Sequence, residues 1–275
     1  MKTIIIGSDL PAMISKVTFK DAQVFVPMKE EKWRRKRAWV GFGARYLPKP
    51  MGLPCHPVRV ITHVDYRVPT QKSLDRYKVK SGMELKIPFA EIVGHVLTQW
   101  PFTPAAFNKV PRRISIVEQE IHFYDGSSEK YDHLIWTDSL VNLLYATGLD
   151  KSSSMETDFP HRPVYVRITM RPPDAPFGNN VMYINYVSDP SIACHRFCDR
   201  DGERHYEGLT MMGQIPHKKL IPGIISESKM SRGMVKQLSE MKISCVGRDE
   251  VWSSSETLYK TWEKLQAMQE VMECQ

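Results

Sequence analysis

The first thirty residues follow the order strand, turn, helix and strand, and this order constrains the fold more than any other feature. Residues 3–7 form a short β-branched run that ends in Gly7, and residues 22–26 form a second apolar run. Between them, residues 10–19 have a helical pattern, with Pro11 placed where a first helical turn tolerates it. These elements predict a βαβ unit with parallel strands and a right-handed crossover, and therefore an α/β fold.

Length, charge and cysteine content limit the class of protein. The chain has 275 residues, enough for one large domain or two interleaved small ones. Its formal net charge of +7 favours an anionic partner, such as a dinucleotide, a nucleotide sugar or nucleic acid. The odd number of cysteines, five, indicates free thiols. No apolar run approaches the roughly 20 residues that span a bilayer, and the opening run is too short for a signal peptide, so we expect a cytoplasmic protein.

The remainder of the chain combines both kinds of element. Apolar spacing predicts a helix over 88–100, Asp125-Gly126 predicts a hairpin, and the serine-rich stretch 151–158 is interpreted as a linker. The other predicted elements are strands at 58–64, 113–118, 120–124, 131–137, 163–170, 181–187, 193–199, 203–208 and 243–246, and a terminal helix at 254–273.

The turn after the first strand resembles a dinucleotide-binding fingerprint. Gly7 occupies the first glycine position, Ser8 follows it, Asp9 stands at the second glycine position and Ala12 at the third. Gly7 can supply the tight turn and Ala12 the close packing of helix on strand. The carboxylate of Asp9, however, stands where a glycine would let a phosphate approach. An ordinary strand-to-helix turn is the alternative interpretation.

The segment 243–252 carries a more specific match. A buried strand ends at Gly247-Arg248, and Trp252 and Ser253 precede a helix with serines as N-cap candidates. This arrangement resembles the final FAD-contacting motif of the amine-oxidase and UDP-galactopyranose-mutase group of flavoproteins, in which a helix N-terminus faces the flavin. A plain turn with a surface arginine is the alternative.

Two internal segments resemble the same group in the expected order. Residues 121–137 resemble its β-meander, in which an Asp-Gly hairpin leads to a Tyr-Asp-x-hydrophobic strand that returns to the nucleotide-binding sheet. Residues 164–196 resemble its substrate-domain sheet. The resemblance implies a Rossmann-like FAD-binding domain, made of residues 1–57, 110–150 and 240–275, with an inserted and mainly antiparallel substrate domain made of residues 58–109 and 151–239.

The resemblance also implies a cofactor and its contacts. The cofactor would be FAD, and its binding residues would be Gly7, Ser8, Asp9, Ala12, Arg45, Gly247, Arg248, Trp252 and Ser253. One departure stands out: the group has an acidic residue at the end of the second strand, whereas here Val26 runs into Pro27 and the nearest acids are Glu30 and Glu31. FAD would then be held weakly, or the fold would be retained with altered use of the cofactor.

Candidate substrate contacts lie in the predicted inserted sheet. Arg196, Tyr183 and Arg167 are suited to an anionic group, because guanidinium groups pair with phosphate or carboxylate. A salt bridge from Arg196 to Asp189 or Glu207 is the alternative. The motif Cys194-His195-x-x-Cys198 with His205 suggests zinc, but His205 is poorly spaced for a zinc ligand, so the sequence predicts no metal site. The scattered histidines indicate no catalytic residue.

Three functions remain open. The first is an FAD-dependent oxidoreductase or lyase that acts on an amine or a C–N bond, extending to a modified nucleobase in DNA. The second is a flavin-dependent mutase that acts on a nucleotide sugar. The third is a nucleic-acid-binding protein with a vestigial flavin fold, which would contact DNA through Lys32, Arg34, Arg35, Lys36 and Arg37.

Overall fold

The structure is a computed structural model that describes residues 1–31, 46–47, 49–65, 89–98, 102–149, 161–170, 181–187, 194–200, 202–208, 217–222, 229–247 and 258–273. The chain divides into two compact units. The first comprises Met1–Cys55, Leu97–His161 and Ile221–Gln275, and the second comprises His56–Val96 and Arg162–Leu220. Each unit is built around its own large sheet, and the predicted α/β class with an inserted, mainly antiparallel sheet is confirmed.

The helices and strands are, in chain order, β1 (Thr3–Ile6), α1 (Leu10–Thr18), β2 (Gln23–Val26), β3 (Cys55–Asp65), β4 (Phe89–Leu97), β5 (Ala106–Phe107), β6 (Pro111–Ser115), β7 (Glu120–Phe123), β8 (Ser128–Lys130), β9 (His133–Trp136), α4 (Leu140–Thr147), β10 (His161–Met170), β11 (Val181–Val187), β12 (Cys194–Arg200), β13 (Glu203–Gly208), β14 (His217–Pro222), α6 (Lys229–Glu240), β15 (Ile243–Cys245) and α7 (Leu258–Glu273). None of the helices in the described part of the chain is long and apolar enough to cross a membrane.

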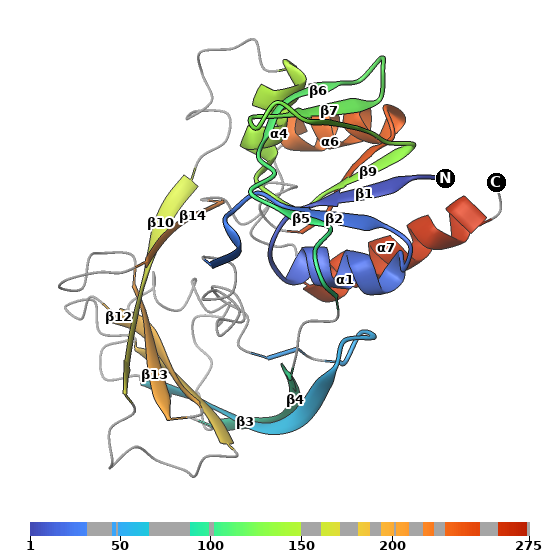
Figure 1. The fold of residues 1–275 in the computed structure, drawn as a ribbon. Coiled ribbons are helices and arrows are strands. Elements are labelled where there is room, and N and C mark those ends of the chain that lie inside the picture. The colour runs from blue at the N-terminus through green and yellow to red at the C-terminus, as the bar shows by residue number, and fades with distance from the viewer. Residues whose placement is uncertain are drawn as a thin grey trace. The chain divides into compact units, whose positions relative to one another are not determined.

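The first unit contains a five-stranded sheet in the order β15-β9-β1-β2-β5. All of its neighbouring strands run parallel, including β1 and β2, so the predicted βαβ unit is confirmed. In Figure 1, α1 and α7 cover one face of this sheet, and α4 and α6 cover the other. Parallel sheets need such cover on both faces because their strands are apolar on both sides.

The strand sequences explain the two layers of core. Ile4 and Ile6 pack toward α4 and α6, in a cluster that includes Leu143 and Leu238, and both isoleucines are fully buried. Ile5 lies on the opposite face, in a cluster with residues of α1 and α7. Side chains alternate along a strand, so one run of three isoleucines supplies both layers. Each buried isoleucine contributes about 1.5–3 kcal/mol.

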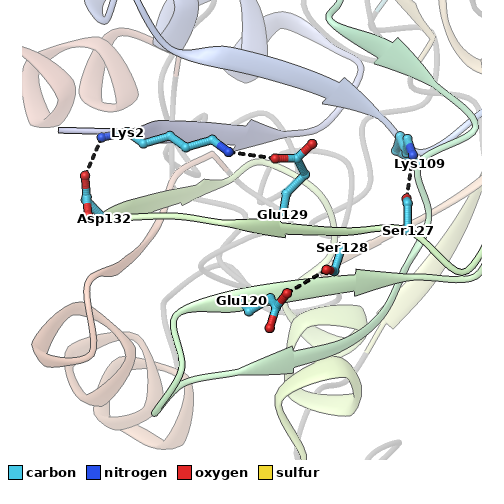
Figure 2. Close-up of polar contacts among 7 residues, drawn as sticks. All are labelled: Lys2, Lys109, Glu120, Ser127, Ser128, Glu129 and Asp132. Carbon is cyan, nitrogen blue, oxygen red and sulfur yellow. Dashed lines mark hydrogen bonds and ion pairs between the residues drawn. The ribbon is translucent and has the colours of Figure 1, made fainter.

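The three-stranded sheet β6-β7-β8 belongs to the first unit. The predicted Asp125-Gly126 turn is present, with Gly126 at φ +85°, but it joins β7 to the short β8 and not to the strand at 131–137. The pattern missed β8 because Ser128–Lys130 is entirely polar. The following strand, β9, pairs with β1, as the resemblance implied. In Figure 2, Lys2 joins these elements, with its ammonium 2.6 Å from Glu129 and its backbone amide 2.5 Å from Asp132.

The second unit contains a seven-stranded sheet in the order β14-β10-β13-β12-β11-β3-β4. The helix predicted over 88–100 is wrong, because Phe89–Leu97 forms the edge strand β4. Its apolar residues fit helical spacing, but β-branched Ile92 and Val93 favour a strand, and pairing with β3 decides the outcome. The predicted strands at 193–199 and 203–208 are present as β12 and β13, which pair antiparallel. The predicted linker at 151–158 lies outside the described residues.

Candidate functional site

The carboxyl edge of the five-stranded sheet contains a reversal of strand order. From β1 the chain crosses to β2 on one side, whereas β9 and β15 lie on the other side. The reversal therefore falls between β1 and β9. In open α/β sheets, ligands bind outside the carboxyl ends of the strands at such a point. The residues that follow these strands, Gly7, Thr137 and Gly247, define the candidate site.

Gly7 and Thr137 are packed against each other at this edge. A Cβ atom on Gly7 would lie 1.8 Å from Thr137 Oγ1, and Gly7 has φ +153°. Thr137 is 2% exposed, and its amide and hydroxyl both donate to the carbonyl of Ile6, at 2.9 and 3.0 Å. Only glycine fits after β1, so the tight turn that the fingerprint requires is present. Sequence analysis predicted Thr137 as the last residue of a strand and assigned it no function.

The remaining fingerprint residues start α1. Ser8 is buried, and Ala12 is fully buried where the helix packs on the sheet. Asp9 is the N-cap, with extended backbone at φ −128°, and its side chain makes no capping hydrogen bond. The amides of the first helical turn lack partners within the helix, which favours an anion at this end. The carboxylate of Asp9 places a negative charge at the same end.

Gly247 follows β15, next to β9. The amide of Val246 donates to the carbonyl of Trp136 at 3.1 Å, which extends the pairing of the two strands to their ends. Gly247 is buried and has φ +101°, a conformation that favours glycine. Gly7, Thr137 and Gly247 therefore terminate three adjacent strands. The predicted cofactor residues Arg45, Arg248, Trp252 and Ser253 lie outside the described residues.

The end of β2 is bonded to the segment after β5. The amide of Lys109 donates to the carbonyl of Val26 at 3.1 Å, and the amide of Asn108 donates to the carbonyl of Met28 at 2.8 Å. The ammonium of Lys109 lies 2.7 Å from Asp125 and 2.6 Å from Ser127, the contact drawn in Figure 2. Sequence analysis missed this segment because β5 has only two residues.

The contact of Lys109 changes the acidity of Asp125. Hydrogen bonds from Lys109 and Ser127 lower the pKa of Asp125 to about 2. The ammonium also lies 5.1 Å from the ring centroid of Phe123. Lys109 thereby ties the β7–β8 turn to the end of the parallel sheet.

The backbone register of the second unit places two of the predicted substrate contacts on one face of the sheet. Arg167 is opposite Tyr206, and Tyr206 is opposite Phe197. Asp199 follows Phe197 by two positions and is opposite Tyr183. Residues opposite one another share a face, as do residues two apart, so Arg167 and Tyr183 share a face. Arg167 is exposed there.

The third predicted contact, Arg196, occupies the other face. It precedes Phe197 by one position and is opposite Glu207, which is 2% exposed. The three residues therefore do not form one cluster on one face. In this backbone register Glu207, one of the two acids that the sequence analysis named as a partner of Arg196, is its cross-strand neighbour.

Among the described residues, one group brings together three side chains with the chemistry of metal ligands. Glu118, Glu120 and His122 bring ligand atoms within 4.8 Å of one another near the β6–β7 turn, a group that sequence analysis missed. Glu118 is exposed and the other two are partly buried, and Glu120 already accepts a hydrogen bond from Ser128 at 2.5 Å. In the second unit, Cys198 is opposite His205, whose Nε2 lies 2.9 Å from Glu203.

No protein-family model matches the chain, and no curated protein is significantly similar to it in sequence. The sheets and helices form the Rossmann-type fold of the FAD-binding flavoprotein group, so the resemblance of the motifs is confirmed for the fold. One solved structure with this fold is reduced UDP-galactopyranose mutase. It is similar to this chain with a TM-score of 0.64 and 11% identity, over 100% of this chain and 94% of that chain.

Two further structures are similar over most of this chain. The PF1083 protein from Pyrococcus furiosus has a TM-score of 0.48 and 11% identity, over 96% of this chain and 97% of that chain. HpxO from Klebsiella pneumoniae, complexed with FAD and uric acid, has a TM-score of 0.41 and 13% identity, over 97% of this chain and 64% of that chain.

Proposed function

We propose that the chain binds FAD along the carboxyl edge of its five-stranded sheet and is a flavin-dependent enzyme. One observation carries the proposal: the strand order reverses between β1 and β9, and the strand ends there carry Gly7, Thr137 and Gly247. A dinucleotide needs such a crevice with close access to the backbone. The fold of UDP-galactopyranose mutase, to which this chain is similar, supports the same class.

The residues present fit most of a dinucleotide. Gly7 and Gly247 would admit the cofactor to the backbone, and the first turn of α1 would hold the pyrophosphate through its amides. Ser8 could donate its hydroxyl to the same group. Two features weaken the fit, the carboxylate of Asp9 at the helix N-terminus and the absence of an acid at the end of β2. We therefore propose binding of modest affinity, with Arg45, Arg248, Trp252 and Ser253 as further contacts.

For the reaction we propose oxidation or cleavage at an amine or a C–N bond. When bound, the flavin supplies the electron acceptor, and the chain supplies position and electrostatics. We propose Arg167 and Tyr183, on one face of the seven-stranded sheet, as contacts for an anionic part of the substrate. For Arg196, on the other face, the cross-strand pair with Glu207 has the better geometrical support. No catalytic residue is assigned.

A mutase reaction on a nucleotide sugar is the second candidate. The similarity in fold to UDP-galactopyranose mutase favours it, because the match extends over both units of this chain. It predicts that a nucleotide diphosphate sugar perturbs the absorbance of the bound flavin. A flavoprotein that responds to an amine and to no such sugar would rule against it.

The net charge of +7 and the basic run at 32–37 support nucleic acid as a partner. We propose that the substrate is a base within DNA. The chain would contact this DNA through Lys32, Arg34, Arg35, Lys36 and Arg37. Binding should fall steeply with salt, and replacement of Arg34, Arg35 and Arg37 by alanine should reduce both the affinity and its dependence on salt. Absent or salt-insensitive binding would remove DNA from the proposal.

The test of the proposed function is the absorbance spectrum of the purified protein, before and after incubation with FAD and removal of the excess. The proposal expects flavin bands that remain with the protein after desalting. A protein that stays colourless and shows no FAD binding by calorimetry would overturn it.

A further inference from the structure

The end of β2 lacks the polar group that a dinucleotide-binding fold places there. In such folds an acidic residue about 20 residues after the first glycine accepts hydrogen bonds from the ribose. In this chain the strand ends in Val26 and continues through Pro27 and Met28. None of these side chains can accept a hydrogen bond from a hydroxyl group, apart from the weak thioether acceptor of methionine. A bound ribose would therefore need a hydrogen-bond acceptor from a residue beyond the end of β2.

The strand next to β2 brings such an element to the same edge. β5 runs parallel to β2, with Val26 opposite Phe107, so the chain leaves both strands at the same edge of the sheet. Asn108 is the first residue after β5, and its amide donates to the carbonyl of Met28 at 2.8 Å. Asn108 is exposed, so its carboxamide lies beside the end of β2, where the acid is missing.

The backbone holds Asn108 in a defined conformation. Its φ is +58°, in the left-handed region that asparagine tolerates better than most residues. The amide of the next residue, Lys109, bonds to Val26 at 3.1 Å, and the ammonium of Lys109 is fixed by Asp125. One backbone bond to β2, one to Met28 just after it and one ion pair thus hold the segment, so the backbone that carries the carboxamide is ordered.

We propose that Asn108 replaces the missing acid and recognises the ribose of the adenosine half of FAD. This inference rests on the proposed function. The pyrophosphate is proposed to lie at the start of α1, which follows β1. In the strand order β1-β2-β5, Asn108 follows β5, so it lies on the same side of β1 as the end of β2. A carboxamide oxygen accepts from a ribose hydroxyl and its NH₂ group donates. Because the group is neutral, the contact is weaker than that of a carboxylate.

The experiment measures FAD affinity by calorimetry in wild-type protein and in Asn108→Gly and Asn108→Asp. Glycine removes the carboxamide and keeps the positive φ available. We expect Asn108→Gly to weaken FAD binding about five- to tenfold, as for loss of one neutral hydrogen bond. Asn108→Asp should bind at least as tightly as wild type. The exposed Asn142→Gly, on α4, is the control for loss of an asparagine elsewhere and should leave the affinity unchanged.

A competition series identifies the group that is recognised. ADP and its 2′-deoxy and 3′-deoxy forms displace FAD from the wild-type protein, and at least one deoxy form should compete less well. In Asn108→Gly this difference should disappear. Unchanged FAD affinity in Asn108→Gly, or a loss in Glu30→Gln or Glu31→Gln instead, would overturn the role of Asn108 and leave FAD binding intact. A wild-type protein that binds no FAD would overturn the proposed function as well.

Discussion

Asp199 and Arg204 are opposite each other on β12 and β13 and make a two-pronged contact. Nε lies 2.5 Å from Oδ1, and one terminal nitrogen, Nη2, lies 2.6 Å from Oδ2. The Asp199 side chain is 1% exposed, and the guanidinium carbon of Arg204 lies 4.5 Å from the ring centroid of Phe197. The hydrogen bonds to Asp199 raise the pKa of Arg204, so the guanidinium stays charged over the whole accessible pH range.

Removal of one partner of this pair should destabilise the protein more than removal of both. Asp199→Ala leaves a mostly buried guanidinium without its counter-charge, and we expect a loss of about 3 kcal/mol in the free energy of unfolding. Asp199→Leu combined with Arg204→Met should cost less, because no charge remains buried. Urea unfolding followed by far-UV circular dichroism gives both values. A double variant less stable than Asp199→Ala would contradict this account.

Gly7→Ala should destabilise the first unit through its collision with Thr137. The added Cβ would lie 1.8 Å from Oγ1, and alanine is strained at φ +153°. We expect a loss of about 2–3 kcal/mol in unfolding free energy. Thr137→Ala in the same chain should recover part of the loss. Gly148→Ala is the matched control, since it has a positive φ but nothing within 4 Å of the added atom.

Gly247→Val should abolish flavin retention while the chain stays largely folded. Gly247 is buried at φ +101° beside the candidate site, so a β-branched side chain is strained there and would occupy the space of the cofactor. Arg248→Ala should weaken retention by about 1.5–3 kcal/mol if the guanidinium makes a charged hydrogen bond. The measurement is the ratio of flavin to protein absorbance, with far-UV circular dichroism as the check on folding. Full FAD content in Gly247→Val would contradict the assignment of Gly247 to the FAD-binding site.

Asp9→Gly should tighten FAD binding. The variant restores a second glycine and removes a negative charge from the N-terminus of α1, where the pyrophosphate is proposed to lie. We expect at least a threefold gain in affinity by calorimetry, larger at low salt. Asp9→Asn separates charge from bulk, because it removes the charge and keeps the size. If both variants bind FAD more weakly, the carboxylate contributes to the site and does not oppose the cofactor.

The ion pair of Lys109 and Asp125 should contribute stability that depends on pH. The pKa of Asp125 is lowered to about 2, so its stabilising contribution is present above the usual value of 3.8 and is lost as the pH falls toward 2. Lys109→Met should therefore be less stable than wild type at neutral pH and should approach it below pH 2. Urea midpoints between pH 2 and 7 test this. A difference that stays constant with pH would contradict it.

Local patterns were sufficient where a fold element depends on its own residues. Successive side chains of a strand point to opposite faces, so three isoleucines in a row, Ile4, Ile5 and Ile6, predict a strand buried on both faces. Gly7 marks its end. Local pattern failed at β4, where helical spacing is outweighed by pairing with β3 in the sheet. The spacing of apolar residues within the nine residues of β4 contains no information about a partner strand elsewhere in the chain.

The parts of the candidate site that sequence analysis missed depend on contacts between distant segments. Thr137 matters because β9 pairs with β1, and Asn108 matters because a strand of two residues pairs with β2. A single sequence shows neither pairing. The clearest signal available was the asparagine itself, a residue type that tolerates the left-handed conformation found at 108.

The order of the strands in the first unit sets the order in which that unit can be completed during synthesis. β1 emerges first, but its neighbour β9 follows about 130 residues later, and β15 completes the sheet only at Cys245. Such distant pairings slow folding because the intervening chain must be closed into a loop before the strands gain anything from contact. Until then the sheet is incomplete, and apolar residues of these strands can contact other chains.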